Sequence, residues 1–119
     1  MRIESLLRLT PFDLRCIDKA IVYIGTHYAD KVSPDDLAIE VSLTKEKLQA
    51  GFQQKTNFTL HEYILQVRIE KAKQILIDSN NPVKLIARKT GFKNNSHFSR
   101  VFKKLTGQSP VSYRLQYNQ

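Results

Sequence analysis

The sequence predicts an all-α protein whose seven helices form two helix-turn-helix subdomains joined by a long linker helix. Three observations support this fold class. Residues that cap helices recur along the chain, apolar residues recur every three or four positions, and one pattern of residues occurs twice. Alternating polar and apolar runs, which are typical of strands, do not occur in the 119 residues.

Capping residues mark seven helix starts. Proline fits the first turn of a helix, and a polar residue before it can accept a hydrogen bond from a free amide. Four starts have this form: Thr10-Pro11, Ser33-Pro34, Asn81-Pro82 and Ser109-Pro110. Thr59 with Glu62 fits a capping box, and Thr10 with Asp13 resembles one. The other two starts are Thr44 and Asn94.

Apolar spacing predicts the buried face of each helix. On the first helix we expect Cys16 to be half-buried beside one buried stripe, formed by Leu14, Ile17, Ile21, Ile24 and Tyr28. The next two helices are expected to bury Leu37, Ala38, Val41, Leu48 and Phe52. A long helix over residues 60–78 carries Tyr63, Ile64, Val67, Ala72, Ile75 and Leu76. The last large pair is expected to bury Leu85, Ile86, Phe98, Val101, Phe102 and Leu105.

The second half of the chain repeats the first at an offset of 49 to 50 residues, as in Phe52 and Phe102. In each copy an alanine precedes a turn residue by four positions, Ala38 before Ser42 and Ala87 before Gly91. Alanine allows two helices to cross closely, and glycine in a turn accepts a positive φ. This pattern predicts a helix-turn-helix motif in each copy.

The positive charge lies in one half of the chain. Residues 1–58 hold eight basic and eight acidic side chains, whereas residues 59–119 hold eleven and three, which accounts for the net charge of +8. From Ser79 onward there are eight Lys or Arg and no Asp or Glu. Such an excess repels itself unless a polyanion neutralises it, which favours nucleic acid first and an anionic membrane surface second.

Exposed polar residues on the second helix of each motif are the candidate DNA contacts. Gln and Asn can read adenine and Arg can read guanine in the major groove, whereas Lys suits phosphates. The first copy is expected to present Lys45, Glu46, Gln49 and Gln53. The second copy is expected to present Asn95, Ser96, Ser99, Arg100 and Lys103, with Lys84, Lys93 and Lys104 as further phosphate contacts. A linker helix of roughly 28 Å approaches the ~34 Å between successive major grooves, so one monomer could enter both.

Other functional classes fit the sequence less well. An enzyme would need a nucleophile motif, a phosphate-binding glycine loop or paired histidines, so we expect no catalytic residue, metal or cofactor, and a structural role for His27 and His61. A protein adaptor could use the acidic residues Asp35, Asp36 and Glu40, but it leaves the acid-free C-terminal third unexplained. RNA binding lacks an aromatic stacking surface. No apolar run approaches the ~20 residues of a membrane span.

Several residues of the second copy occur in a specific order: Ile86-Ala87, Gly91-Phe92, residues 96–104, residues 107–110 and Tyr113-Arg114. This run closely resembles the signature of AraC/XylS-type transcription regulators, and the similarity extends over residues 12–114. It implies binding to double-stranded promoter DNA and activation of transcription through RNA polymerase. It also places Ala50 and His97 among the DNA-contact positions, together with Lys45, Glu46, Gln49, Asn95, Ser96, Ser99 and Arg100.

The first copy departs from the family pattern. Ala50 and Gly51 stand where the family commonly has arginine and an apolar residue, and Gln53-Gln54 stand where it has two lysines. Ser42 and Asn57 replace glycines, although Asn tolerates the left-handed conformation at a helix end. Glycine within a helix costs about 1 kcal/mol relative to alanine. We therefore expect the second copy to dominate DNA binding.

The expected organisation is an extension or linker remnant over residues 1–11, a first helix-turn-helix subdomain over 12–58, a linker helix over 59–79 and a second subdomain over 80–119. Residues 3–7 form either a short extra helix or part of that remnant. A sensor domain usually precedes this part in the family, so the chain is either a stand-alone regulator or an excised C-terminal domain. The single cysteine suggests a reducing compartment, so we expect the protein to be cytoplasmic. We also expect this domain to be a monomer, with any sensor or dimerisation domain absent from this chain.

Overall fold

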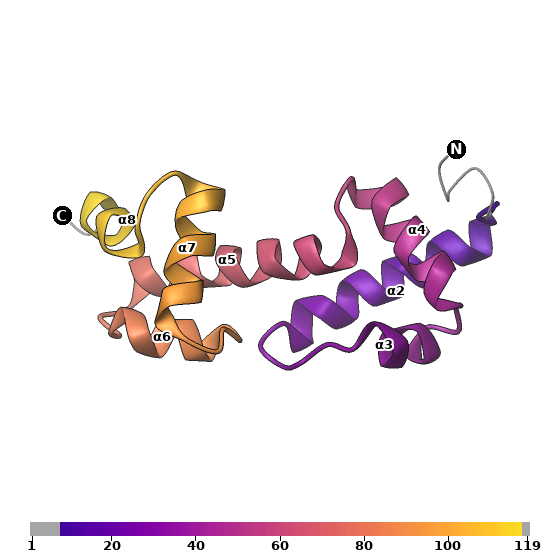
Figure 1. Cartoon of the computed structure of the whole chain (residues 1–119), viewed down its shortest axis with the longest axis horizontal. Helices are drawn as coiled ribbons and strands as arrows, with labels where there is room; N and C mark the ends of the chain where they lie inside the picture. The colour runs from indigo at the N-terminus through magenta and orange to yellow at the C-terminus, as the bar shows by residue number, and fades with distance from the viewer. Residues whose placement is uncertain (1–7, 118–119) are drawn as a thin grey trace. The chain divides into compact units, whose positions relative to one another are not determined.

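The computed structural model describes residues 8–117, and within them the chain forms seven α-helices and no strand, as predicted (Figure 1). The segment 3–7, for which we expect a short helix or a linker remnant, lies outside these residues. The helices are α2 (Pro11–His27), α3 (Pro34–Glu40), α4 (Lys45–Thr56), α5 (Leu60–Asp78), α6 (Val83–Lys89), α7 (Asn95–Thr106) and α8 (Pro110–Tyr117).

The described chain divides into two units that interleave in sequence. Unit 1 contains the residues up to His27 together with Val32–Ile64, and unit 2 contains Tyr28–Lys31 together with the residues from Leu65 onward. Within unit 1, α4 packs against α2 and α3, and within unit 2, α7 packs against α6 and α8. Each unit therefore holds one helix-turn-helix motif, α3–α4 in unit 1 and α6–α7 in unit 2.

Most of the predicted caps are present. Asp13 N–H donates to Thr10 Oγ1 and Thr10 N–H donates to Asp13 Oδ2, both at 3.0 Å. Thr59 and Glu62 exchange the same two bonds at 2.9 and 3.1 Å. At four other starts a side-chain oxygen accepts from the amide three residues later, and the acceptors are Ser33, Thr44, Asn94 and Ser109. These bonds satisfy amides that have no partner within the helix.

The predicted cap at Asn81 is wrong. Helix α6 begins at Val83, and Pro82 occupies the N-cap position without any side-chain cap. Asn81 instead donates its backbone N–H to Ser79 Oγ, at 3.2 Å, in the turn that follows α5. The asparagine therefore belongs to the end of one helix and not to the start of the next.

The buried face of α2 is rotated from the predicted stripe. Ile17 and Ile24 are fully buried as expected, but Leu14 and Ile21 are half-buried, and Tyr28 lies beyond the end of the helix. The other buried residues are Asp13, Cys16 and Ala20, and Cys16 is 2% exposed where we expected half-burial. Helix α4 packs against α2, so the buried face of α2 follows from this packing and not from hydrophobic spacing alone.

Unit 2 has a core of aromatic and aliphatic side chains, made of Ile69, Ala72, Leu76, Ile86, Ala87, Phe92, Phe98 and Phe102. Val101, Ile75 and Tyr113 pack against it and are partly buried. Leu105 is 37% exposed, so its predicted burial is wrong. The Tyr113 ring meets the Phe102 ring edge-on, with centroids 5.4 Å apart, and closes the core at this end of α7.

The internal repeat is reproduced in backbone hydrogen bonds. Leu43 N–H donates to Ala38 O at 2.9 Å, and Phe92 N–H donates to Ala87 O at 3.0 Å, so the two turns are built alike. The turn residues differ: Ser42 has a φ of +62° and Gly91 a φ of +98°. The helix ends also correspond, because left-handed residues cap both α4 and α7, Asn57 in the first copy and Gly107 in the second.

Candidate nucleic-acid interface

Helix α7 separates an apolar face from a polar one. Phe98 and Phe102 are fully buried, and their spacing of four residues places them on one side of the helix. Asn94 Oδ1 accepts from His97 N–H at 2.8 Å and fixes the start of the helix. The predicted contacts that are exposed on the chain segment from the turn to the last turn of α7 are Lys93, Asn95, Ser96, Arg100, Lys103 and Lys104.

Two predicted contacts on α7 are half-buried, namely His97 and Ser99. The His97 ring packs edge-on against Phe92, with centroids 5.5 Å apart. Phe92 is itself 3% exposed and belongs to the core of unit 2. The imidazole is therefore partly covered by the core of unit 2 and partly exposed to solvent.

Helix α4 also exposes most of its predicted contact residues. Lys45, Glu46 and Gln49 are exposed, and Gln53 is half-buried. Ala50 is only 4% exposed. The expectation, drawn from the family resemblance, that Ala50 lies at a DNA-contact position is therefore wrong for this chain. A methyl side chain is too short to extend past its neighbours, as an arginine at the same position would.

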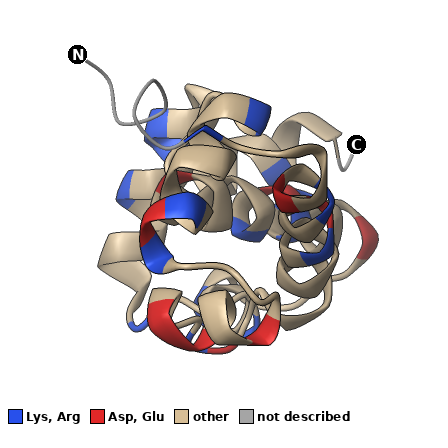
Figure 2. Ribbon diagram, turned by 90° about the vertical axis from the view of Figure 1, so that its right-hand side faces the viewer, with Lys and Arg blue, Asp and Glu red and all other residues tan. Residues whose placement is uncertain are grey.

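Every lysine of α4 is paired with an aspartate of unit 1. Lys45 Nζ lies 3.7 Å from Asp35 Oδ1, a pair exposed to solvent. Two further pairs join α4 to α2, Lys47 with Asp13 at 3.1 Å and Lys55 with Asp18 at 2.8 Å. No such pair forms on Arg100, Lys103 or Lys104 of α7 among residues 8–117, and Figure 2 colours these charges along the ribbon. Among the described residues, α7 thus carries positive charge that no ion pair offsets.

Asp13 connects the start of α2 to α4. The residue is 5% exposed, and its carboxylate accepts from Thr10 N–H and pairs with Lys47. The backbone hydrogen bond from Thr10 is the main cause that lowers the pKa of Asp13 below its usual value; Lys47 adds to this, and burial opposes it. The carboxylate is therefore held in its charged form, which keeps Lys47 occupied.

Gly51 is a packing requirement of unit 1. A Cβ at this position would lie 2.5 Å from both Cδ1 and Cγ1 of Ile17, which is fully buried on α2. The sequence-based expectation that alanine would be better here by helix propensity is therefore incomplete. Because the side chain is absent, the Ile17 side chain of α2 packs directly against the backbone of α4 at this position.

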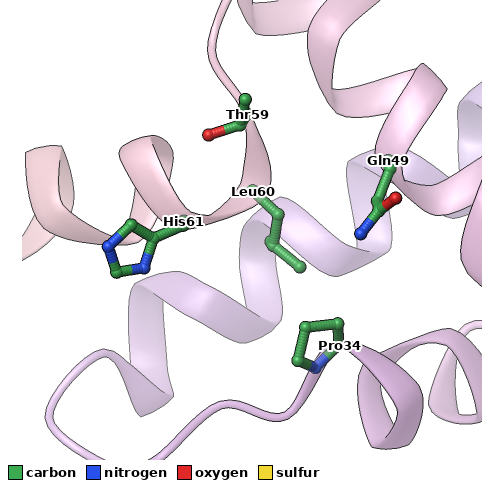
Figure 3. A pocket seen from close by; sticks show the side chains of 5 residues that line it. All are labelled: Pro34, Gln49, Thr59, Leu60 and His61. Carbon is green, nitrogen blue, oxygen red and sulfur yellow. The ribbon is translucent and has the colours of Figure 1, made fainter.

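Beside α4 there is a hollow of about 300 Å³ within unit 1, lined by Pro34, Gln49, Thr59, Leu60 and His61 (Figure 3). Gln49 extends into it from α4 toward Leu60 and Pro34, and the Thr59 hydroxyl is already occupied by the cap of α5. Gln49 and His61 are the two polar side chains on its wall that remain available. In the region the structure describes there is no group of three or more potential metal ligands. None of the described helices is both long and apolar enough to cross a membrane.

The basic side chains outside the sequence-based candidate set include Arg88, Lys89 and Arg68. Arg88 and Lys89 are exposed in the last turn of α6, next to the turn that leads to α7. Their signal was present, because both belong to the acid-free stretch after Asp78. Arg68 on α5 is different, because it is half-buried and bonded to distant backbone carbonyls. The resemblance to the family includes Arg68 in the linker helix but assigns it no role.

Comparisons with known proteins agree with this geometry. A profile of the family described as helix-turn-helix domain matches residues 37–116. The chain is 33% identical over 94 residues to the HTH-type transcriptional activator RhaS of Escherichia coli O1:K1, covering 79% of this chain and 34% of that protein. It spans only 33% to 60% of the length of the curated relatives it matches.

Two solved structures share the fold. A transcriptional regulator of the AraC-type DNA-binding class from Chromobacterium violaceum matches with a TM-score of 0.84 and 24% identity, over 88% of this chain and 94% of that one. The DNA-binding domain of AdpA, solved in complex with a target DNA, matches with a TM-score of 0.81 and 20% identity, over 86% and 92% of the two chains.

Proposed function

The chain belongs to the AraC-type family of helix-turn-helix transcription regulators and forms a DNA-binding domain of that family, and we propose that it reads a specific promoter sequence with α7 as the dominant recognition helix. The observation that carries this proposal is the polar face of α7. Its cations have no acidic partner among the described residues, and its polar side chains stand opposite the buried Phe98 and Phe102.

The residues divide by chemistry into two roles. Arg100 and Asn95 can form paired hydrogen bonds to guanine and adenine, with Ser96, His97 and Ser99 beside them. The cations that position the domain on phosphates are Lys84, Arg88, Lys89, Lys93, Lys103 and Lys104. Such cations release counterions from DNA, so the proposed binding weakens steeply with salt.

Helix α4 contributes a second, weaker set of contacts in this proposal. Lys45, Glu46, Gln49 and Gln53 supply donors and acceptors, but the aspartate next to Lys45 reduces the attraction to phosphate. Unit 1 then occupies a neighbouring major groove and adds specificity more than affinity. In this proposal the two DNA-binding subdomains are residues 12–58 and residues 80–119.

The biological role follows from the family. RhaS is a transcriptional activator, and we extend that role to this chain, with RNA polymerase as its protein partner and the cytoplasm as its place of action. Binding is proposed to occur without catalysis, metal or cofactor and with this domain as a monomer.

Selection from a random pool of ~40-base-pair duplexes at two salt concentrations tests the proposal. Enrichment of two boxes about one helical turn, ~10 base pairs, apart is the expected result, because two recognition helices then read adjacent grooves. Enrichment of a single box would confine specificity to α7. Binding without enrichment that disappears in salt would contradict sequence-specific recognition.

A further inference from the structure

Arg68 joins three parts of unit 2 that are distant in sequence. Its Nε–H donates to the carbonyl oxygen of Tyr28 at 2.7 Å, and its Nη2 donates to the carbonyl oxygen of Asp30 at 3.1 Å. The guanidinium carbon lies 5.8 Å from the centre of the Phe92 ring, within the range of a cation–π contact. Burial lowers the pKa of Arg68, but the group stays charged because its ordinary pKa is so high.

The turn before α7 rests on the same group. A Cβ at Gly91 would lie 2.8 Å from Arg68 Nε and 3.0 Å from both Cα and O of Ala29. Gly91 also has a φ of +98°, so this position combines a left-handed backbone with close approach on one side. The next residue, Phe92, contacts the rings of both His97 and Phe98 at the start of α7.

We propose that Arg68 is a positioning residue for DNA reading. Together with Tyr28–Lys31 it forms a brace, which supports the Gly91-Phe92 turn and through it sets how the first turn of α7 enters the major groove. The brace also includes Lys71, whose Nζ lies 5.6 Å from the centre of the Tyr28 ring. This inference rests on the proposed function of α7.

Arg68 acts through the turn and not through DNA in this proposal. Two of its donor atoms already bind backbone carbonyls, and the planar fork of a guanidinium matches that arrangement better than an ammonium group does. The second helix-turn-helix unit is therefore completed by four residues that precede α3 in the chain, about 40 residues before Arg68.

Arg114 provides a matched control. Its Nε–H donates to Leu76 O at 3.0 Å and its Nη2 donates to Ser79 O at 3.2 Å, which is the same pair of bonds in the same unit. These acceptors lie at the end of α5, away in sequence from the turn before α7. Arg114→Ala therefore removes an equivalent pair of guanidinium hydrogen bonds and leaves the contacts of Arg68 in place.

The test uses the full chain with Arg68→Ala, Arg68→Lys and Arg114→Ala, at a temperature where circular dichroism shows each variant to be folded. Without DNA, we expect Arg68→Ala to shift the backbone amide signals of Gly91, Phe92 and Asn95, and Arg114→Ala to leave them in place. With DNA, we expect Arg68→Ala to reduce the ratio of selected-duplex to scrambled-duplex affinity about tenfold, with an unchanged salt slope. Arg68→Lys should resemble Arg68→Ala, because it keeps the charge and loses the fork.

Three results would overturn the proposal. Unchanged amide signals in Arg68→Ala would show that the brace does not hold the turn. Equal loss of affinity for both duplexes, with a salt slope smaller by about one, would make Arg68 a phosphate contact. Equal losses of the affinity ratio in Arg68→Ala and Arg114→Ala would reduce its role to stability. If the wild-type chain itself prefers neither duplex, the proposed function fails, and the amide signals alone decide whether the brace exists.

Discussion

Helices α4 and α7 occupy the same place in two copies of one motif, yet their basic side chains differ in whether they are paired with acidic ones. The three lysines of α4 each face an aspartate from α2 or α3, whereas the arginine and two lysines of α7 have no acidic partner within residues 8–117. The basic side chains of α4 are therefore paired within their own unit, whereas those of α7 have no acidic partner among the described residues. The comparison teaches that two copies of one motif can keep a similar backbone while their surface charges differ.

The backbones of the two copies have stayed alike where the residues differ. Asn57 ends α4 with a φ of +64° and Gly107 ends α7 with a φ of +81°. Thr56 and Thr106 form the same bonds to the carbonyls four residues earlier, at 2.6 and 2.8 Å. Asparagine is the residue besides glycine that best tolerates the left-handed region, so the substitution keeps the turn.

The largest expected effect comes from removing a proposed base contact on α7, compared with removing one on α4. Arg100→Ala should weaken binding to the selected duplex by roughly 1–3 kcal/mol, because a paired contact to a base is lost, whereas Gln49→Ala should have little effect. Equilibrium binding at one fixed salt concentration measures both. A greater loss for Gln49→Ala than for Arg100→Ala would reverse the ranking of the two units.

A second prediction concerns the close approach of α2 and α4. Gly51→Ala should destabilise unit 1, because overpacking against Ile17 costs about 1–3 kcal/mol and exceeds the ~1 kcal/mol gained in helix propensity. Gly25→Ala is the control, because no atom lies within 4 Å of the added Cβ, and it should stabilise by about 0.4–1 kcal/mol. Urea unfolding gives both values. Stabilisation by both variants would show that the Ile17 side chain moves aside at little cost in free energy and would contradict this prediction.

Acid should affect unit 1 through Asp13. Because the folded-state pKa is lowered, the carboxylate contributes stability above its unfolded pKa of about 3.9, and this contribution is lost as the pH falls through the folded value. Asp13→Asn should therefore be less stable than wild type near neutral pH, and the difference should shrink in acid. Urea midpoints between about pH 7 and pH 3 measure this. A difference that stays constant with pH would contradict a role for the charge.

The smallest expected effect comes from releasing the α4 lysines. Asp18→Asn with Asp35→Asn frees Lys55 and Lys45, and nonspecific duplex affinity should rise a few-fold with a steeper salt dependence. Stability should change by less than about 1 kcal/mol, because both pairs are exposed. Glu70→Gln serves as control, since it removes an exposed pair with Lys73 on α5. An equal rise in that control would mean that overall charge, and not α4, is responsible.

Local signals in the sequence were sufficient for most of the secondary structure. Capping boxes at Thr10 and Thr59 and the helix over residues 60–78 depend on residues within a few positions of one another, and all are confirmed. The predicted DNA contacts on α7 depend on a strong separation of polar and aromatic residues along one helix. The structure leaves five of them exposed and two, His97 and Ser99, half-buried. Their role in binding stays a prediction.

Errors arose where a neighbouring helix decides the outcome. On α2 the buried residues include Cys16 and Ala20, whereas Leu14 and Ile21 of the predicted stripe are half-buried, and on α4 Ala50 is buried. Leu105 has the right spacing for a core residue but is 37% exposed. Periodicity identifies an apolar face, but the helix that packs on it selects which part is covered.

By itself the sequence determined the all-α class, the repeated motif and the concentration of positive charge in the second half, because each depends on residue type and short spacing. Only the tertiary structure decided which charges remain available and which residues support the turn before α7. Lys55 meets Asp18 and Arg68 meets the carbonyl of Tyr28 across long separations in sequence. Such pairings depend on how helices pack, and side-chain spacing along one helix carries no record of them.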